Sequence, residues 1–114
     1  LVIQIESIEA VNNIESLVSH KQVDGVMIGP YDISGSLGVP GKLFDPKVKK
    51  SCLKVINACK KYKKSCGIQD SNPSDKSIKN FLNEGYSFII LSSDIFTLWK
   101  WTENINIILG KLKK

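Results

Sequence analysis

The sequence contains no arginine: its sixteen basic residues are all lysines, set against eleven acidic residues, and the formal net charge is +5. Because the arginine guanidinium supplies the forked hydrogen bonds that read guanine and phosphate, this absence argues against nucleic-acid recognition. Long apolar runs are also missing. The longest, such as 88–91, has four residues, whereas a membrane helix needs roughly 20. We therefore predict a protein that binds neither nucleic acid nor a membrane.

Cysteine and histidine are scarce, and they form no metal-binding spacing. The three cysteines, Cys52, Cys59 and Cys66, are an odd number without a CxxC pair, which argues against a disulfide framework. Cys52 and Cys59 lie two helical turns apart on an apolar stripe, where thiols behave as small buried hydrophobes. No secretion signal is visible in the sequence, and Leu1 already lies in a strand-like segment. We expect buried, reduced thiols, a cytoplasmic location, and a chain that begins at a cut.

Glycine and proline are too few for a low-complexity chain, with eight and four residues. The composition, 42% hydrophobic and 24% charged, is that of an ordinary globular protein. A chain of 114 residues has room for one core and not for two.

Short apolar segments alternate with helical patterns along the chain. The segments 1–5, 25–28, 66–68 and 86–91 are typical of buried strands. The segments 8–18, 45–64, 75–83 and 94–113 have helical spacing, and Asp45 and Asp94 are suitable helix caps. The lysines of 45–64 form a solvated basic face or, alternatively, a surface for an acidic partner. This alternation predicts an α/β fold with a parallel sheet covered by helices.

Two acidic residues follow strand ends. Glu6 comes directly after the first strand, and Asp32 lies in the long irregular stretch 29–44 that follows the second. In parallel folds the functional groups collect beyond the carboxyl ends of the strands. If the two strands are neighbours, the carboxylates converge, and a hard divalent cation would relieve their repulsion. The alternative is that Glu6 begins a solvated loop and Asp32 caps a turn.

Residues 4–7 (QIES) and 23–41 (VDGVMIGPYDISGSLGVPG) closely resemble the HpcH/HpaI-type class II aldolase family, the 4-hydroxy-2-oxoheptanedioate aldolases. The segments 45–48, 66–68, 84–88 and 92–94 follow in the same order as in that family. The resemblance implies that residues 1–114 are a partial domain, the C-terminal half (strands five to eight) of a TIM-type (β/α)₈ barrel.

The resemblance also implies a site and a chemistry. Glu6 and Asp32 match the family's ligands for Mg²⁺ or Mn²⁺, with Co²⁺ also suitable, and Gly29, Pro30, Tyr31 and Asp32 match its substrate-binding segment. The implied substrates are pyruvate and an aldehyde, joined or released as a 4-hydroxy-2-oxo acid through an enolate. The catalytic His and the substrate-binding Arg of the family are expected upstream, so we expect no catalytic residue in this half and no activity from it alone.

The remaining polar and aromatic features have simpler interpretations. His20 falls on the amino-terminal side of the predicted sheet, so we expect a surface or packing residue. We interpret Gln69 and Asp70 as loop residues exposed to solvent, and Ser93 with Asp94 as a helix cap. The last helix is broadly apolar around Phe96, Trp99 and Trp101, which predicts a homo-oligomer contact or, alternatively, packing on the chain's own core.

Two other functions remain open from the sequence. One is an acyl-CoA lyase of the related phosphoenolpyruvate/pyruvate barrels, although the Gly-Pro-x-Asp segment favours the aldolases. The other is a truncated, non-catalytic remnant that serves as a binding or assembly module, which the absence of arginine favours.

Overall fold

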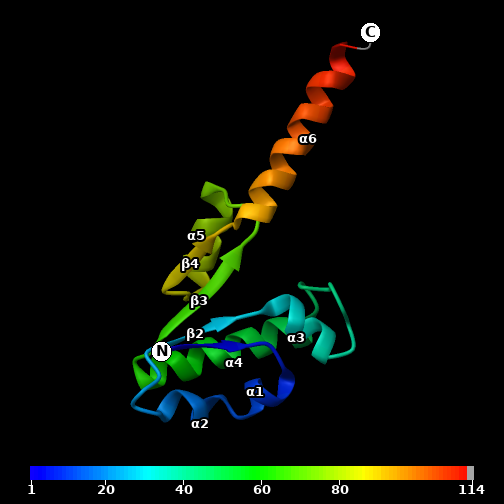
Figure 1. Ribbon diagram of the computed structural model, residues 1–114. Coiled ribbons are helices and arrows are strands. Elements are labelled where there is room, and N and C mark those ends of the chain that lie inside the picture. The colour runs from blue at the N-terminus through cyan, green and yellow to red at the C-terminus, as the bar shows by residue number, and fades with distance from the viewer. Residues whose placement is uncertain (113–114) are drawn as a thin grey trace.

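The computed structural model describes residues 1–112, which form one sheet of four strands with helices between them (Figure 1). The strands are β1 (Val2–Ile5), β2 (Gly25–Ile28), β3 (Ser65–Asp70) and β4 (Phe88–Leu91). The helices are α1 (Ile8–Asn12), α2 (Ile14–Ser19), α3 (Pro30–Ser36), α4 (Pro46–Tyr62), α5 (Asp75–Glu84) and α6 (Asp94–Leu112).

The sheet has the order β1-β2-β3-β4, and every neighbouring pair is parallel. Its register aligns Ile5 with Ile28 and Ile28 with Ile68. These three side chains are buried on the helix-covered face, whereas Gln4 and Gln69, on alternate positions, are exposed on the other face. The predicted parallel α/β organisation is confirmed.

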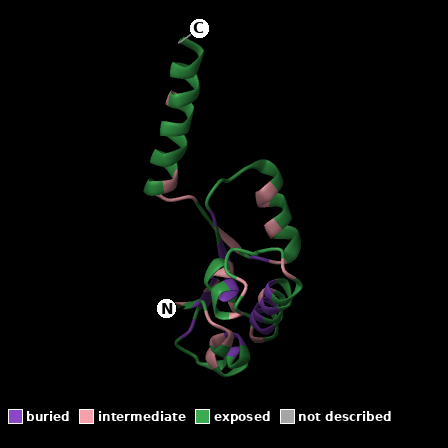
Figure 2. Cartoon of the chain, turned by 90° about the vertical axis from the view of Figure 1, so that its right-hand side faces the viewer, coloured by how far each residue is buried: buried purple, intermediate pink, exposed green. Residues whose placement is uncertain are grey.

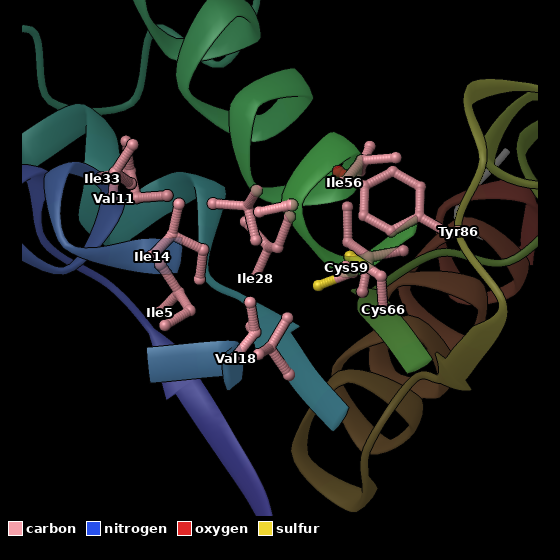
Figure 3. Close-up of a cluster of buried hydrophobic side chains, with 14 residues drawn as sticks. Ile5, Val11, Ile14, Val18, Ile28, Ile33, Ile56, Cys59, Cys66 and Tyr86 are labelled. Atoms are coloured by element: carbon pink, nitrogen blue, oxygen red, sulfur yellow. The ribbon is translucent and has the colours of Figure 1, made fainter. Parts of the chain in front are cut away.

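The core lies between the sheet and the helices α1, α2 and α4, as Figure 3 shows. Val11 and Ile14 come from the first two helices, and Ile56 and Cys59 from α4. Each fully buried side chain of this size stabilises the fold by roughly 1.5–3 kcal/mol. The lysines of α4 that face away from this core are exposed, as a solvated basic face requires: Lys47, Lys49, Lys50, Lys54, Lys60 and Lys61.

Helix α4 begins and ends where local chemistry predicts. The Asp45 carboxylate accepts the Lys47 N–H at 2.8 Å, and Pro46 is the first helical residue. The helix ends at Lys63, which adopts a left-handed conformation with φ 55°. The predicted bounds 45–64 are therefore right to within two residues.

Two local predictions are wrong. The expected single helix 8–18 is broken at Asn13, whose backbone leaves the helical region and whose side-chain amide donates to the Glu9 carbonyl at 3.1 Å. The stretch 29–44, expected to be irregular, contains helix α3. Pro30 supplies the fixed φ suited to a first helical position, and the buried Ile33 anchors the helix to the core.

Helix α6 extends away from the rest of the chain (Figure 1) and carries no buried residue along 94–112 (Figure 2). Trp99 and Trp101 are each more than 60% exposed. The alternative that this helix packs on the chain's own core is therefore wrong; its predicted end at Lys113 lies outside the described residues. Within residues 1–112 no helix is long and apolar enough to cross a membrane.

Candidate functional site

Glu6 and the segment 29–32 lie together at the carboxyl edge of the sheet. Glu6 follows β1 and Gly29 follows β2, and the register places the last residues of these strands, Ile5 and Ile28, side by side. The Gly29 N–H donates to the Ile5 carbonyl at 2.9 Å, which continues the pairing one residue beyond the strands. The structure thus brings together the two carboxylates that the sequence singled out.

The two carboxylates converge above the α-carbon of Gly29. A β-carbon at Gly29 would lie 3.0 Å from Asp32 Oδ2, 3.0 Å from Glu6 Cγ and 3.4 Å from Glu6 Oε1. Glycine is required here by the close approach of these side chains, not by an unusual backbone angle. The α-carbon of Gly29 therefore lies between the side chains of Glu6 and Asp32. These three residues are called the cradle below.

The neighbouring groups orient these carboxylates. The side-chain amide of Gln4 donates to Glu6 Oε1 at 2.7 Å. Gly29 is the N-cap of α3 and has no side chain to cap it, so the N–H groups of Tyr31 and Asp32 have no intrahelical partner. Two carboxylates and two free amide donors thus face the same edge of the sheet.

Sequence inspection missed Ser34, which fixes the loop after α3. Its hydroxyl donates to the Tyr31 carbonyl and accepts the Gly41 N–H at 2.8 Å, and the side chain is completely buried. This pair of bonds closes the loop against the helix that carries Asp32. A serine in a polar, glycine-rich segment has no periodicity that would mark it, so only the fold identifies its role.

The chemistry of this cradle fits a hard divalent cation. Glu6 and Asp32 are exposed carboxylates, the ligand type that Mg²⁺ and Mn²⁺ prefer. Within residues 1–112 there is no cluster of three His, Cys, Asp or Glu residues suited to a metal. A cation held here would therefore have two carboxylate ligands from the described chain and would take its other ligands from water or substrate.

A cavity of about 680 Å³ adjoins the cradle. The segment 29–32 lines it together with Gln4, Phe44 and Lys49, and among the described residues of its wall Lys49 is the only cationic one. The Lys49 ammonium lies 5.4 Å above the centre of the Phe44 ring. Most of the remaining wall is apolar and comes from α4, α5 and β3. The cavity has the size of a small-molecule site.

The prediction that Asp70 is an exposed loop residue is wrong. It is the last residue of β3 and only 8% exposed; Oδ1 accepts the Asn72 N–H at 3.0 Å, and Oδ2 has no hydrogen-bond partner. The prediction failed because the strand is longer than the apolar run 66–68 and carries Asp70 under the following turn. Gln69 is exposed, as expected, but it lies within β3 and not in a loop.

The thiols are free, as predicted: Cys59 and Cys66 are buried and Cys52 is half-buried. Figure 3 shows Cys59 and Cys66 beside Tyr86 at one end of the core. A hydrogen bond to Cys59, together with burial, raises the pKa of the Cys66 thiol, and burial raises the pKa of Cys52 and of Tyr86. Raised pKa values keep Cys52 and Cys66 protonated, which supports packing rather than nucleophilic chemistry.

His20 lies where it was expected, and Asp94 lies at the start of a helix, with the preceding Ser93 accepting the Thr97 N–H through its carbonyl. His20 is exposed and ends α2, at the end of the sheet opposite the carboxylates. Asp94 is the first residue of α6, and its carboxylate accepts the Ile95 N–H at 2.8 Å.

Comparison with known proteins decides the family. The model of the HpcH/HpaI aldolase/citrate lyase family matches residues 1–100. The chain belongs to this family. It is 30% identical over 95 residues to 5-keto-4-deoxy-D-glucarate aldolase of Citrobacter koseri and 32% identical over 95 residues to that of Klebsiella pneumoniae. Each match covers 83% of this chain but 36% of the relative, so the chain spans about a third of their length.

Solved structures of the family have the same fold as this chain. A family protein from Burkholderia cenocepacia has 26% identity and a TM-score of 0.85, over 99% of this chain and 42% of its own. The HpcH/HpaI aldolase of Desulfitobacterium hafniense has 28% identity and a TM-score of 0.83, over 94% of this chain and 41% of its own. The four parallel βα units of this HpcH/HpaI chain therefore form part of a (β/α)₈ barrel.

Proposed function

We propose that this chain is the C-terminal half of a metal-dependent aldolase domain that cleaves or forms 4-hydroxy-2-oxo acids. The observation that carries the proposal is the convergence of Glu6 and Asp32 on Gly29, at the carboxyl edge of the sheet. In (β/α)₈ enzymes that edge holds the active site. Family membership supplies the reaction class.

In this proposal Glu6 and Asp32 hold the cation, which is Mg²⁺ or Mn²⁺, with Co²⁺ as a third choice. When bound, it would supply Lewis-acid stabilisation of the negative charge that develops on the oxo acid. The chain's own contribution is orientation: Gln4 holds one oxygen of Glu6 by its 2.7 Å hydrogen bond, and α3 fixes the position of Asp32.

The carboxylate of pyruvate would bind the uncapped N–H groups of Tyr31 and Asp32. Pro30 sets the direction of these amides, and Gly29 permits the substrate to approach the backbone. The curated relatives are named for 5-keto-4-deoxy-D-glucarate, which supports a hydroxylated oxo acid as substrate and an aldehyde as the second product.

The proposed reaction needs groups that the described half does not contain. The sequence has no arginine, and its one histidine lies at the other end of the sheet. A general base and a guanidinium would come from the rest of the barrel, so residues 1–114 alone are proposed to be inactive. The free thiols favour a reducing compartment such as the cytoplasm.

We also propose that α6 contacts a neighbouring subunit in a homo-oligomer. Its exposed apolar residues, among them Trp99 and Trp101, have no partner in the described chain. Contiguous exposed apolar surface of this kind marks interaction sites.

Divalent-cation binding tests the proposed metal site in the chain itself. Mn²⁺ titration followed by water-proton relaxation should show one site per chain, and Glu6→Gln or Asp32→Asn should weaken it about tenfold or more because each removes one of two charged ligands. Glu9→Gln is the matched control, an exposed carboxylate on the adjacent helix. Equal Mn²⁺ affinity in all four proteins would contradict the proposed site.

Substitution of Gly29 tests the cradle without removing a ligand. The added methyl of Gly29→Ala would lie 3.0 Å from both side chains, so they must separate. We expect Mn²⁺ affinity to fall about tenfold, with an unchanged far-ultraviolet circular dichroism spectrum. Gly35→Ala is the control, because a β-carbon there meets nothing within 4 Å. Wild-type affinity in Gly29→Ala would show that the carboxylates do not bind a cation together.

A further inference from the structure

Asp70 holds a buried polar atom that has no partner. Within residues 1–112 its Oδ2 is the only buried side-chain nitrogen or oxygen atom that makes no hydrogen bond. The residue is 8% exposed, and Oδ1 accepts the Asn72 N–H. The two ion pairs of the described chain join other residues. Because a buried carboxylate without a partner is unfavourable, this oxygen calls for a donor that the described chain does not supply.

Asp70 lies on the helix-covered side of the sheet. In β3 it alternates with Cys66 and Ile68, whose side chains belong to the core, whereas Gly67 and Gln69 lie on the other side. β3 is an inner strand, paired with β2 along one edge and with β4 along the other. The surroundings of Asp70 therefore come from the described strands and helices and do not depend on strands that precede Leu1.

Ser92 fixes the backbone that carries this carboxylate. Its N–H donates to the Asp70 carbonyl at 2.7 Å, and its hydroxyl donates to the Ser71 carbonyl at 3.2 Å. Ser92 has a φ of 67°, a left-handed conformation that is unfavourable for a residue other than glycine. The two hydrogen bonds offset this strain. The position of Asp70 is therefore set by the fold before any ligand binds, which lowers the entropic cost of binding.

The cavity of about 680 Å³ includes Asp70 in its wall. The part formed by the helix-covered side of the molecule is here called the Asp70 pocket, and its residues are Cys52, Ile56, Ile68, Asp70, Phe81 and Tyr86. The Phe81 and Tyr86 rings pack edge to face, with centroids 5.7 Å apart, and Figure 3 shows Ile56 and Tyr86 at the same end of the core. No residue of α5 is buried along 75–84, so the space between α4 and α5 is incompletely filled.

The charges of the cavity wall favour a cationic ligand. Among its described residues Asp32, Asp70 and Glu84 are acidic, and Lys49 is basic. The Lys49 ammonium lies 5.4 Å from the centre of the Phe44 ring and forms no ion pair with Asp70. A hydroxyl group would satisfy only the hydrogen bond of Oδ2, whereas an ammonium group would also compensate the buried charge. Aromatic rings attract a cation as well.

We propose that the Asp70 pocket binds a small organic amine, with the ammonium group on the Asp70 carboxylate and the apolar body against Ile56, Phe81 and Tyr86. The cavity lies within the range of about 300–1,000 Å³ that small-molecule sites occupy. Binding displaces the side chains that cover Oδ2, a local rotamer change of the kind common at binding sites. The site goes beyond the proposed metal site, because Glu6 is hydrogen-bonded to Gln4, on the opposite side of the sheet.

Calorimetric titration with phenethylamine tests the proposal, both in residues 1–114 and in a longer chain that includes the upstream barrel strands. We expect one molecule to bind per chain, and Asp70→Asn to weaken it at least about tenfold because the charge is lost and the shape is kept. Asp75→Asn, at an exposed carboxylate in the first turn of α5, should leave the affinity unchanged. Phenethyl alcohol should bind at least about tenfold more weakly than the amine. Lys49→Met should strengthen amine binding about threefold, because it removes a like charge from the wall.

Phe81→Ala makes a second test if Asp70→Asn fails to fold, since loss of the ring should weaken amine binding while the carboxylate remains. No binding of phenethylamine at millimolar concentration would overturn the proposal and assign Oδ2 to a water molecule. Equal affinities for the amine and the alcohol would overturn it too, as would equal amine affinities in wild type and Asp70→Asn. Binding by residues 1–114 but not by the longer chain would identify the upstream half as the occupant of the pocket and also overturn it. None of these results would alter the Mn²⁺ binding expected of Glu6 and Asp32.

Discussion

A longer chain in which the upstream barrel strands precede Leu1 should catalyse aldol addition of pyruvate to an aldehyde in the presence of Mn²⁺, whereas residues 1–114 alone should show little or no activity. In the longer chain Glu6→Ala or Asp32→Ala should lower kcat/KM about a thousandfold or more, because loss of a ligand removes the Lewis acid that stabilises the developing charge.

The size of this effect follows from the site. The described chain supplies two carboxylates, and no cluster of three metal-binding residues occurs in residues 1–112. Loss of either carboxylate reduces the number of charged ligands for the cation from two to one, and only the other carboxylate then remains beside Gly29. A non-ligand change should behave differently: Glu9→Ala removes an exposed carboxylate on α1 and should retain activity within about twofold.

Activity would be measured as consumption of pyruvate with a set of aldehydes, with and without a chelator. Robust turnover by residues 1–114 alone would sink the assignment, since this half has no arginine and places its histidine at the wrong end of the sheet. Full activity in the longer Glu6→Ala protein would also contradict it. A protein that keeps Mn²⁺ binding but lacks turnover would preserve the metal site and reject the reaction.

The second large effect concerns stability, at Gly67 in β3, on the side of the sheet opposite the buried side chains of Cys66 and Ile68. A β-carbon there would lie 2.1 Å from Phe88 Cζ and 2.2 Å from Cε2, so the Phe88 ring lies directly on the Gly67 backbone. Gly67→Ala forces the ring to move, and we expect it to destabilise the chain by about 2–3 kcal/mol. Urea denaturation followed by circular dichroism measures the change in the free energy of unfolding.

A double-mutant cycle separates this contact from a general intolerance of Gly67 substitution. Phe88→Ala removes the ring, so Gly67→Ala should cost about 1–3 kcal/mol less in that background. Gly110→Ala, a helical position with nothing within 4 Å of its added β-carbon, should be neutral or slightly stabilising. If Gly67→Ala costs the same with and without the ring, the Phe88 contact is not the cause.

Local patterns were enough to predict the framework of the fold. Apolar runs marked the strands, lysines between apolar residues marked α4, and Asp45 marked its start; the structure confirms each of these. The break at Asn13, the helix at 30–36 and the burial of Asp70 escaped prediction. The first and the last involve short-range hydrogen bonds that apolar periodicity does not reveal, from Asn13 to Glu9 and from Asn72 to Asp70. The helix at 30–36 depends on the anchoring of Ile33 in the core.

By itself the sequence determined the family, the parallel α/β class, and the two carboxylates that follow β1 and β2. These properties can be predicted from the sequence because hydrophobic periodicity, helix-capping residues and sequence motifs each involve residues that are close together in the chain. Only the tertiary structure decided that both carboxylates converge on Gly29, that one side of the sheet is bare, and that α6 leaves the core. Strand register and the direction of each side chain set these outcomes, and both arise from long-range pairing that a single strand does not encode.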